Sequence, residues 1–128
     1  MDEFEFFFEK SWSDGLPVVP PTEERVSRML MGTSRREGES VGVIPPAFEE
    51  ARIRDVAVHA VMAGCRPEYM PVVLAGVEAI LEEPFNINGI QGTMHSVAPL
   101  IILNGPYSKE IDVNGGLGCF GPGFRANA

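Results

Sequence analysis

The chain has 128 residues, of which 45% are apolar, so it is long enough for one domain with its own core and too short for two. Its 18 acidic and 10 basic residues give a formal charge of −8, which argues against a nucleic-acid surface, because such surfaces need clustered Lys and Arg. The sequence opens with no signal-peptide pattern and contains no apolar run of about 20 residues, so we expect a cytoplasmic chain that binds neither nucleic acid nor membrane.

Residues 1–21 are predicted to form a short helix followed by a proline-rich extended arm. Phe4, Phe7 and Phe8 recur at helical spacing with acidic residues around them, which is typical of an amphipathic helix that needs something to pack on. Two interpretations stay open for these rings: packing on the chain's own core, or docking on a partner.

Residues 22–83 are predicted to be mainly helical. A first helix, 23–31, follows a capping threonine, and a polar, glycine-rich loop then leads into a short strand or extended segment at 41–44. A second helix, 48–63, shows a regular apolar stripe and ends at a glycine. A third helix begins at about residue 70 and runs to 83; it is apolar nearly all round, so we expect it to be central.

Residues 84–128 are rich in Gly and Asn, and VAPLIIL (97–103) is their one strong strand pattern. Five glycines lie in the last fourteen residues, and the chain looks unfinished at its end. We therefore predict an α/β fold with about four helices and a few short strands. Residues 1–128 would be a single domain or the N-terminal segment of a larger one.

The break between the second and third helices carries the first candidate site. Cys65 precedes a predicted helix start, where unpaired backbone N–H groups lower the pKa of a thiol and attract anions. Arg66 could hold a carboxylate or phosphate, and Glu68 could act as a base or orient that arginine. The alternative, equally weighted, is structural: the cysteine fills a small space, and the arginine and glutamate form a local ion pair.

The glycine-rich end of the sequence is the second candidate. Successive glycines let backbone amides form a concavity that holds an anion, with Cys119 inside it and Arg125 closing it. The predicted binding residues in this loop are Asn114, Gly115 and Gly116. The alternative is a surface loop whose glycines serve turns, and the pattern matches neither a P-loop nor a dinucleotide fingerprint.

His95 is a further candidate, because it precedes 97–103 in a Gly, Thr and Ser context that permits a ligand to approach the backbone. The two cysteines, Cys65 and Cys119, show no disulfide-framework or zinc spacing and are predicted to be free thiols. No histidine, cysteine or acidic set has metal-ligand spacing, so we assign no metal site, and the cofactor is unknown.

Three blocks of the sequence, in this order, resemble the N-terminal part of an uncharacterised bacterial and archaeal protein family: WSDGLPVVPPTEERV, AVMAGCRPEYMPVVLAGVEA and GPGFRANA. The resemblance covers nearly the whole chain from Trp12 to Ala128. In that family the chain continues past the counterpart of Ala128 with a threonine, a helix and a further domain, and the family is associated with proteins that bear a UGSC motif. The resemblance implies that this chain is part of a larger α/β unit, completed by a second polypeptide.

We therefore expect the small subunit of a hetero-oligomeric enzyme that acts on a small, anionic metabolite. Cys65 would be the nucleophile or redox thiol, Arg66 the substrate anchor, and Glu68 or His95 the proton carrier. In one alternative, a precursor cleaves itself after Ala128 and exposes the family's threonine as the nucleophile of a hydrolase or acyltransferase. In another, the chain is a non-catalytic assembly or binding subunit.

Overall fold

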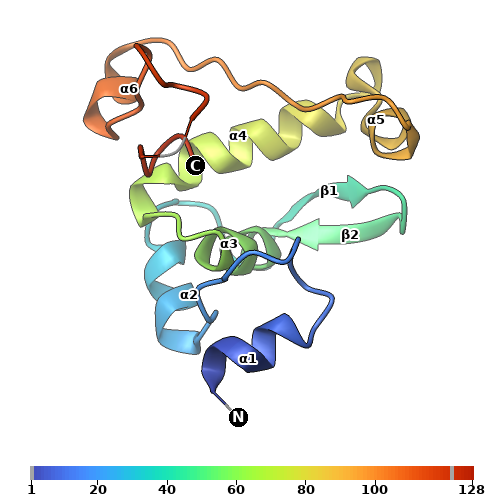
Figure 1. Cartoon of the computed structure of the whole chain (residues 1–128), viewed down its shortest axis with the longest axis vertical. Coiled ribbons are helices and arrows are strands. Elements are labelled where there is room, and N and C mark those ends of the chain that lie inside the picture. Colours follow the sequence, from blue (N-terminus) through green and yellow to red (C-terminus); the bar gives the residue numbers. More distant parts are fainter. Residues whose placement is uncertain (1, 122) are drawn as a thin grey trace.

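Three helices form the centre of the chain, and a two-stranded sheet adjoins them (Figure 1). The computed structural model describes residues 2–121 and 123–128, and for Glu3 and Phe4 the backbone alone, so the predicted role of the Phe4 side chain lies outside the described residues. In chain order, the elements of the described residues are α1 (Glu3–Phe8), α2 (Glu23–Leu30), β1 (Ser40–Ile44), β2 (Glu49–Arg52), α3 (Ile53–Met62), the 3₁₀ turn η1 (Pro67–Tyr69), α4 (Met70–Leu81), the 3₁₀ turn η2 (Glu83–Phe85), α5 (Ile87–Gly92) and α6 (Pro106–Glu110). The predicted α/β class is confirmed, and the short helices α5 and α6 add to the predicted ones.

Helix α2 begins where its capping residue predicts. The Thr22 Oγ1 accepts a hydrogen bond from the Arg25 N–H at 3.4 Å, and two glutamates occupy the first turn, near the positive end of the helix dipole. Val26 and Met29 lie on the buried side and contact α3. Helix α4 likewise starts at Met70 with a proline in its first turn, as predicted.

The second helix is shorter than the sequence predicts, because its first residues form a strand. Residues 49–52 are β2, which pairs antiparallel with β1 in a register that places Ile44 opposite Glu49. Phe48 adopts a positive φ of 55°, which a helix does not allow, so the chain turns there. Helix α3 begins at Ile53, where the Asp55 carboxylate accepts the Arg52 N–H at 2.8 Å.

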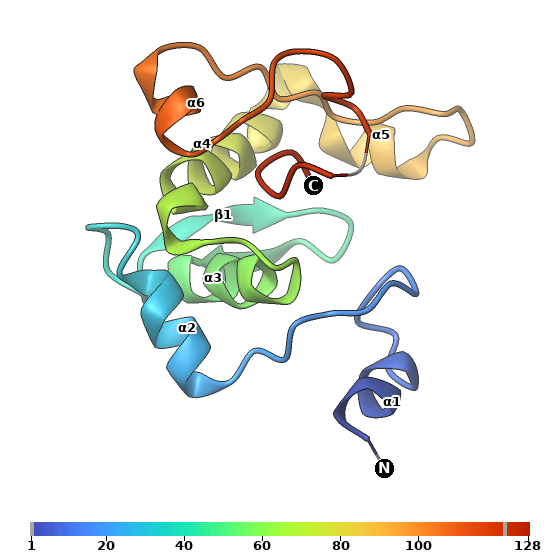
Figure 2. The same ribbon diagram turned by 60° about the vertical axis from the view of Figure 1, so that its left-hand side comes forward.

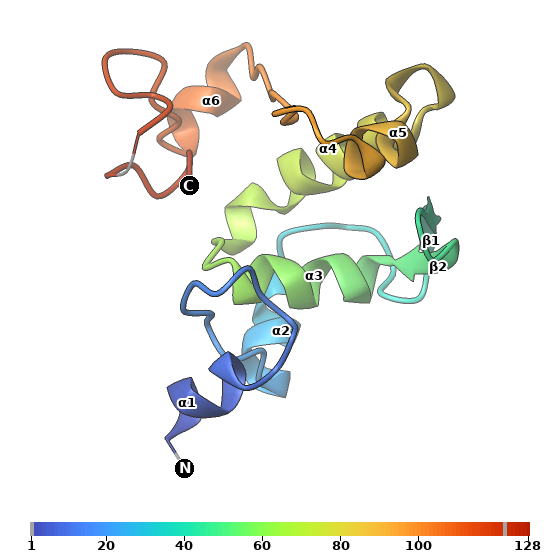
Figure 3. The ribbon, with the colours of Figure 1, turned by 45° about the vertical axis from the view of Figure 1, so that its right-hand side comes forward.

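The apolar core lies where α2, α3 and α4 meet. The buried side chains of this cluster are Val26, Met29, Ile53, Val56, Ala57, Ala60, Val61, Met70 and Leu74. Figure 3 shows α3 and α4 as two layers, with α2 against α3. Arg35, in the loop after α2, donates to the carboxylates of Glu39 and Glu78, and so ties that loop to α4. None of the helices in the described residues is both long and apolar enough to cross a membrane.

The end of α2 touches the turn between α3 and α4 without any side chain between the two backbones. A Cβ atom added to Gly32 would overlap the carbonyl oxygen of Pro67. This close approach is possible only because residue 32 has no side chain. It brings the last turn of α2 beside residues 64–68.

The strongest strand pattern of the sequence does not form a strand. Residues 97–103 run along α4 in Figure 1, and within the described residues no backbone hydrogen bond joins 98–103 to another segment. A strand is assigned through its bonds to a neighbour, and β1 and β2 are paired with each other. The prediction of a strand at 97–103 is therefore wrong for this chain by itself.

The N-terminal helix stands outside the core. Figure 2 shows α1 apart from the layer of α2 and α3, joined to it by a long arm. The Phe6, Phe7 and Trp12 rings contact one another edge to face, with centroids 5.4–6.1 Å apart. Phe8 is exposed. The arm reaches the core at Val19, whose N–H donates to the Met62 carbonyl at 3.0 Å.

Replacing Gly32 by Ala tests whether the contact between α2 and η1 is tight. We expect Gly32→Ala to lower the free energy of unfolding by about 1–3 kcal/mol, because the added methyl group has to push two backbone segments apart. Urea denaturation followed by circular dichroism measures this. Gly38→Ala is the matched control, since its Cβ would meet no atom within 4 Å, and its unfolding midpoint should stay near that of the wild type. Equal midpoints for the two variants would contradict the contact.

Candidate functional site

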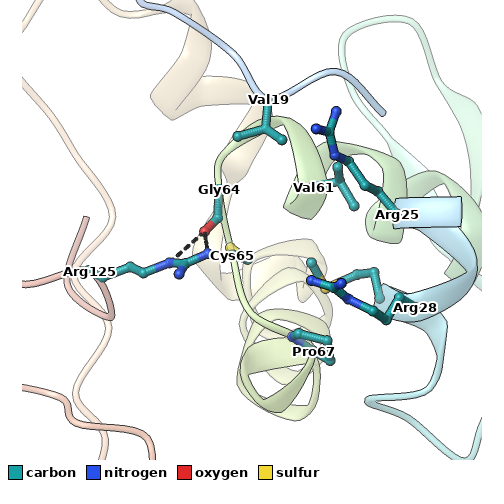
Figure 4. Close-up of a pocket in the computed structure, with 9 residues that line it drawn as sticks. Val19, Arg25, Arg28, Val61, Gly64, Cys65, Pro67 and Arg125 are labelled. Atoms are coloured by element: carbon teal, nitrogen blue, oxygen red, sulfur yellow. Dashed lines mark hydrogen bonds between the residues drawn. The ribbon is translucent and has the colours of Figure 1, made fainter. Parts of the chain in front are cut away.

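A cleft opens between α2, the turn that joins α3 to α4, and the segment that carries Arg125 (Figure 4). Its inner hollow has a volume of about 100 Å³ and its outer hollow about 730 Å³, and Cys65 and Pro67 line both. Four arginines also contribute to the lining: Arg25, Arg28, Arg66 and Arg125. We call this region the arginine cleft.

The turn at the end of α3 places Cys65 in the cleft. Gly64 adopts a φ of +78°, which glycine tolerates without strain, and this conformation ends the helix as the sequence predicts. The Cys65 N–H then donates to the Ala60 carbonyl at 2.9 Å. The η1 turn follows and is held by α6, because the Tyr107 hydroxyl donates to the Glu68 carbonyl at 2.6 Å.

Helix α2 supplies the opposite wall. Arg25 and Arg28 are one turn apart on the helix, next to the stripe that buries Val26 and Met29. Figure 4 shows these two arginines across the cleft from Arg125. The Arg25 Nη1 donates to the Pro20 carbonyl at 2.9 Å, which anchors that side chain on the N-terminal arm.

The third wall comes from the far end of the sequence. The Arg125 Nε and Nη2 both donate to the Gly64 carbonyl, at 3.0 and 2.9 Å. Asn127 supports this position: its Nδ2 donates to the carbonyls of Asn114 and Cys119, and its Oδ1 accepts the Asn114 N–H. The glycine-rich loop is thus closed on itself by two asparagines, and it presents Arg125 to the α3–η1 turn.

The arginine cleft carries concentrated positive charge in an acidic chain. Elsewhere, Arg35 and Arg54 each pair with two glutamates. Within the described residues, none of the four arginines of the cleft makes an ion pair with a carboxylate. The predicted alternative of an Arg66–Glu68 ion pair is therefore not found. Four cations without carboxylate partners give the cleft the charge that favours an anion.

The thiol of Cys65 is half-buried in the cleft, and its pKa is raised above the ordinary value of a cysteine. Burial is the main cause, because it disfavours the thiolate; the positive charge of Arg125 acts in the opposite direction with a smaller effect. The predicted lowering of this pKa by a helix start is therefore wrong. The helical turn that follows, η1, has three residues, and α4 begins five residues after Cys65. The thiol is therefore not next to the start of a long helix, which is the feature that the predicted lowering of its pKa required. At neutral pH the group is a protonated thiol.

The structure brings some of the predicted site residues together and leaves others elsewhere. Cys65, Arg66, Glu68 and Arg125 all line the cleft. The remaining predicted residues are outside its lining: His95, Asn114, Gly115, Gly116 and Cys119. His95 is exposed in the segment after α5.

The side chain of Asn114, a residue of the predicted anion-binding loop, makes hydrogen bonds within that loop. Its Nδ2 donates to the Leu117 carbonyl and its Oδ1 accepts the Gly116 N–H, so one backbone amide of the predicted anion cradle already has an acceptor within the loop. Among the residues that the structure describes, no three His, Cys, Asp or Glu side chains gather into a metal site.

Sequence reasoning missed Arg25 and Arg28, which read as ordinary residues of an exposed helix face. Their spacing of three residues beside the apolar Val26 and Met29 was the signal that both would border the buried side.

No protein-family model, curated protein or solved structure matches the chain. The function proposed below therefore rests on the geometry of the arginine cleft.

The pH dependence of Cys65 alkylation tests the electrostatic link to Arg125. We expect iodoacetamide to react with Cys65 along a titration curve that moves to higher pH in Arg125→Ala, because the variant loses a positive charge that stabilises the thiolate. The measurement uses a Cys119→Ser background, so that Cys65 is the one thiol. Arg36→Ala, which removes an exposed arginine outside the cleft lining, should leave the curve in place. A shift of the same size in both variants would contradict the assignment.

Proposed function

We propose that this chain is the small subunit of a hetero-oligomeric enzyme and that it binds a small anionic metabolite in the arginine cleft. The observation that carries the proposal is the gathering of four arginines, from three separate parts of the sequence, around one thiol. Arginine is suited to carboxylates and phosphates, because its planar group donates two parallel hydrogen bonds to one anion. Arg28 and Arg66, which have no acceptor in the described residues, are the primary ligands.

The outer hollow, at about 730 Å³, has the size of a small-molecule site, whereas the inner one, at about 100 Å³, has room for a few water molecules. Such a ligand would lie between the last turn of α2 and η1, with its charged group toward Arg28 and Arg66. Glu68, which lines the outer hollow, contributes a negative charge at one side. This carboxylate favours a ligand that also carries a hydrogen-bond donor, such as a hydroxy acid.

Cys65 lies at the junction of the two hollows, and its raised pKa determines the role that it can take. A bound anion further disfavours the thiolate, because like charges repel. In the enzyme that we propose, the thiol therefore meets the substrate as an S–H group that can donate a proton. Its use as a nucleophile requires a base, the role predicted for Glu68, which lines the outer hollow together with Cys65.

Equilibrium binding tests the anion site directly. Isothermal titration calorimetry of the full chain with citrate and with inorganic phosphate should give saturable binding, weakened about tenfold or more in Arg28→Ala and in Arg66→Ala, because each variant loses a charge-assisted hydrogen bond. Arg36→Ala is the control of equal charge and should bind as the wild type does. Equal dissociation constants in all three variants would mean that the anions bind through net charge alone, and absence of saturable binding would refute the site.

Protection of the thiol tests whether the anion lies beside Cys65. In the Cys119→Ser protein, saturating citrate should slow the alkylation of Cys65 severalfold, since the ligand both covers the thiol and disfavours the thiolate. In the Cys65→Ser protein, the alkylation of Cys119, which is outside the cleft lining, should be unchanged by citrate. Equal slowing of both cysteines would place the anion elsewhere or indicate a general salt effect.

A further inference from the structure

The segment 97–103 is an apolar stretch that the chain leaves largely uncovered. Val97, Leu100, Ile101 and Ile102 are 50–74% exposed. Within the described residues, the backbone of 98–103 makes no hydrogen bond to another segment. β-branched and other apolar residues in an extended run are typical of a buried strand, whose backbone groups pair with a neighbour. This segment has the composition of a strand and runs as a drawn-out trace along α4 in Figure 1, and it lacks the neighbour.

One face of the segment already has a layer beneath it. The Ile101 side chain lies against α4, where its Cδ1 would be 3.3 Å from a Cβ on Gly76. Because side chains alternate along an extended chain, those of 98, 100 and 102 point away from α4. Leu100 and Ile102 are 63% and 74% exposed, and Ile101 itself stays 61% exposed, so the apolar side chains on both faces of the segment are largely open. Apolar residues on both faces are the pattern of a strand that is covered on both sides.

Pro99 determines which backbone edge of the segment can pair. The N–H and C=O groups of successive residues in a strand point alternately to its two edges, so Pro99 removes a donor from the edge that it shares with Ile101. The opposite edge keeps the donors of Ala98, Leu100 and Ile102. Prolines in sheets are confined to edge strands, with the missing donor directed away from the neighbour. The uninterrupted edge is therefore the one that can join a sheet.

The surface of the whole chain indicates how much a partner has to cover. The accessible surface is 9179 Å², whereas a folded monomer of this mass exposes about 6,700 Å², so about 2,500 Å² is in excess. An excess of that size is comparable to one partner's share of a large obligate interface. A surface of this extent fits a permanent partner better than a transient one.

A second copy of this chain cannot supply what the segment lacks. Two copies paired antiparallel about a twofold axis would place both α4 helices on the same face of the new sheet. Leu100 and Ile102 of both copies would then stay uncovered on the other face. The segment needs a partner that brings both an open sheet edge and an apolar layer over that sheet.

We infer that 97–103 is an edge strand that joins the β-sheet of a different polypeptide through the backbone of Ala98, Leu100 and Ile102. The partner's sheet has an open edge, and an apolar layer of the partner covers Leu100 and Ile102. Main-chain hydrogen bonds supply the affinity and the outward side chains supply the fit, as in other cases of strand addition. This inference rests on the segment and on the excess surface of the chain, and it is independent of the anion proposed for the arginine cleft.

Amide hydrogen exchange tests the inference on the complex as it exists. The full chain, tagged at its N-terminus and expressed at native level in its own host, is isolated with what it binds, and peptides that span 98–103 are compared with those of the chain alone. We expect exchange within seconds in the isolated chain and at least about 100-fold slower exchange in the complex. A complex in which 98–103 still exchanges freely would overturn the inference, as would recovery of the chain as a lone monomer.

A pair of proline variants tests which edge pairs. Ile102→Pro removes a donor from the predicted pairing edge and should abolish the complex, whereas Ile101→Pro removes one from the opposite edge and should retain it. Both side chains are more than half exposed, and the backbone of neither residue bonds to another segment, so both variants should fold. The unfolding midpoint of each isolated variant is measured first, because Ile101→Pro also removes the side chain that lies against α4. Equal loss or equal retention of the partner would overturn the inference. A homodimer with protected amides at 98–102 would also overturn it, because the partner would then be a second copy.

Discussion

The direct backbone contact between Gly32 and Pro67 is the constraint on which the rest of the structure depends. It fixes the end of α2 against the turn between α3 and α4, and no side chain separates the two segments. Because α2 is held there, Arg25 and Arg28 face the turn that carries Cys65. The same contact closes the core, since Met29, one turn earlier, packs among the residues of α3 and α4. The packing of α2 on the core and the position of its arginines in the cleft therefore both depend on this close approach.

The distribution of charge separates the structural arginines from those of the cleft. Arg54 links Glu23 on α2 to Glu37 in the following loop, and Arg35 links that loop to α4, so both pairings hold elements together. The arginines of the cleft are directed at carbonyl groups or at solvent. In a chain with 18 acidic residues, this lack of carboxylate partners is a property of where the arginines lie and not of a shortage of acids. Glu68 is the one acid in the cleft lining given by the described residues, so the cleft keeps a net positive charge.

Local signals predicted the local structure well. The Thr22 cap, the glycine at position 64 and the proline after Met70 each act within one turn of the chain, and each marks an element boundary in the structure. Predictions of strands, which depend on pairing with residues distant in the sequence, were wrong at 49–52 and at 97–103. The sequence predicts a helix over 48–63, and residues 49–52 instead form β2, because the spacing of apolar residues carries no information about pairing with β1. VAPLIIL has strand composition, yet no neighbour within the described residues pairs with it.

The candidate site shows the same division. Cys65, Arg66 and Glu68 are adjacent in sequence, so their proximity was predictable, whereas the arrival of Arg125 at the Gly64 carbonyl depends on the tertiary fold. The two arginines of α2 were overlooked because a helix face gives no sign of what packs beside it. The thiol pKa was predicted in the wrong direction, since burial is a property of the folded chain and outweighs the nearby charge.

Arg125 has one further consequence. Its guanidinium uses two of five donors on the Gly64 carbonyl, and the same residue belongs to the loop that Asn127 closes on Asn114. A ligand that adds hydrogen bonds to this guanidinium restricts the loop as well as the side chain. By thermodynamic linkage, if such a ligand favours the ordered loop by a given factor, the ordered loop binds the ligand more tightly than the disordered loop by that same factor. Binding of a ligand to Arg125 in the cleft and ordering of the glycine-rich loop are thus thermodynamically coupled.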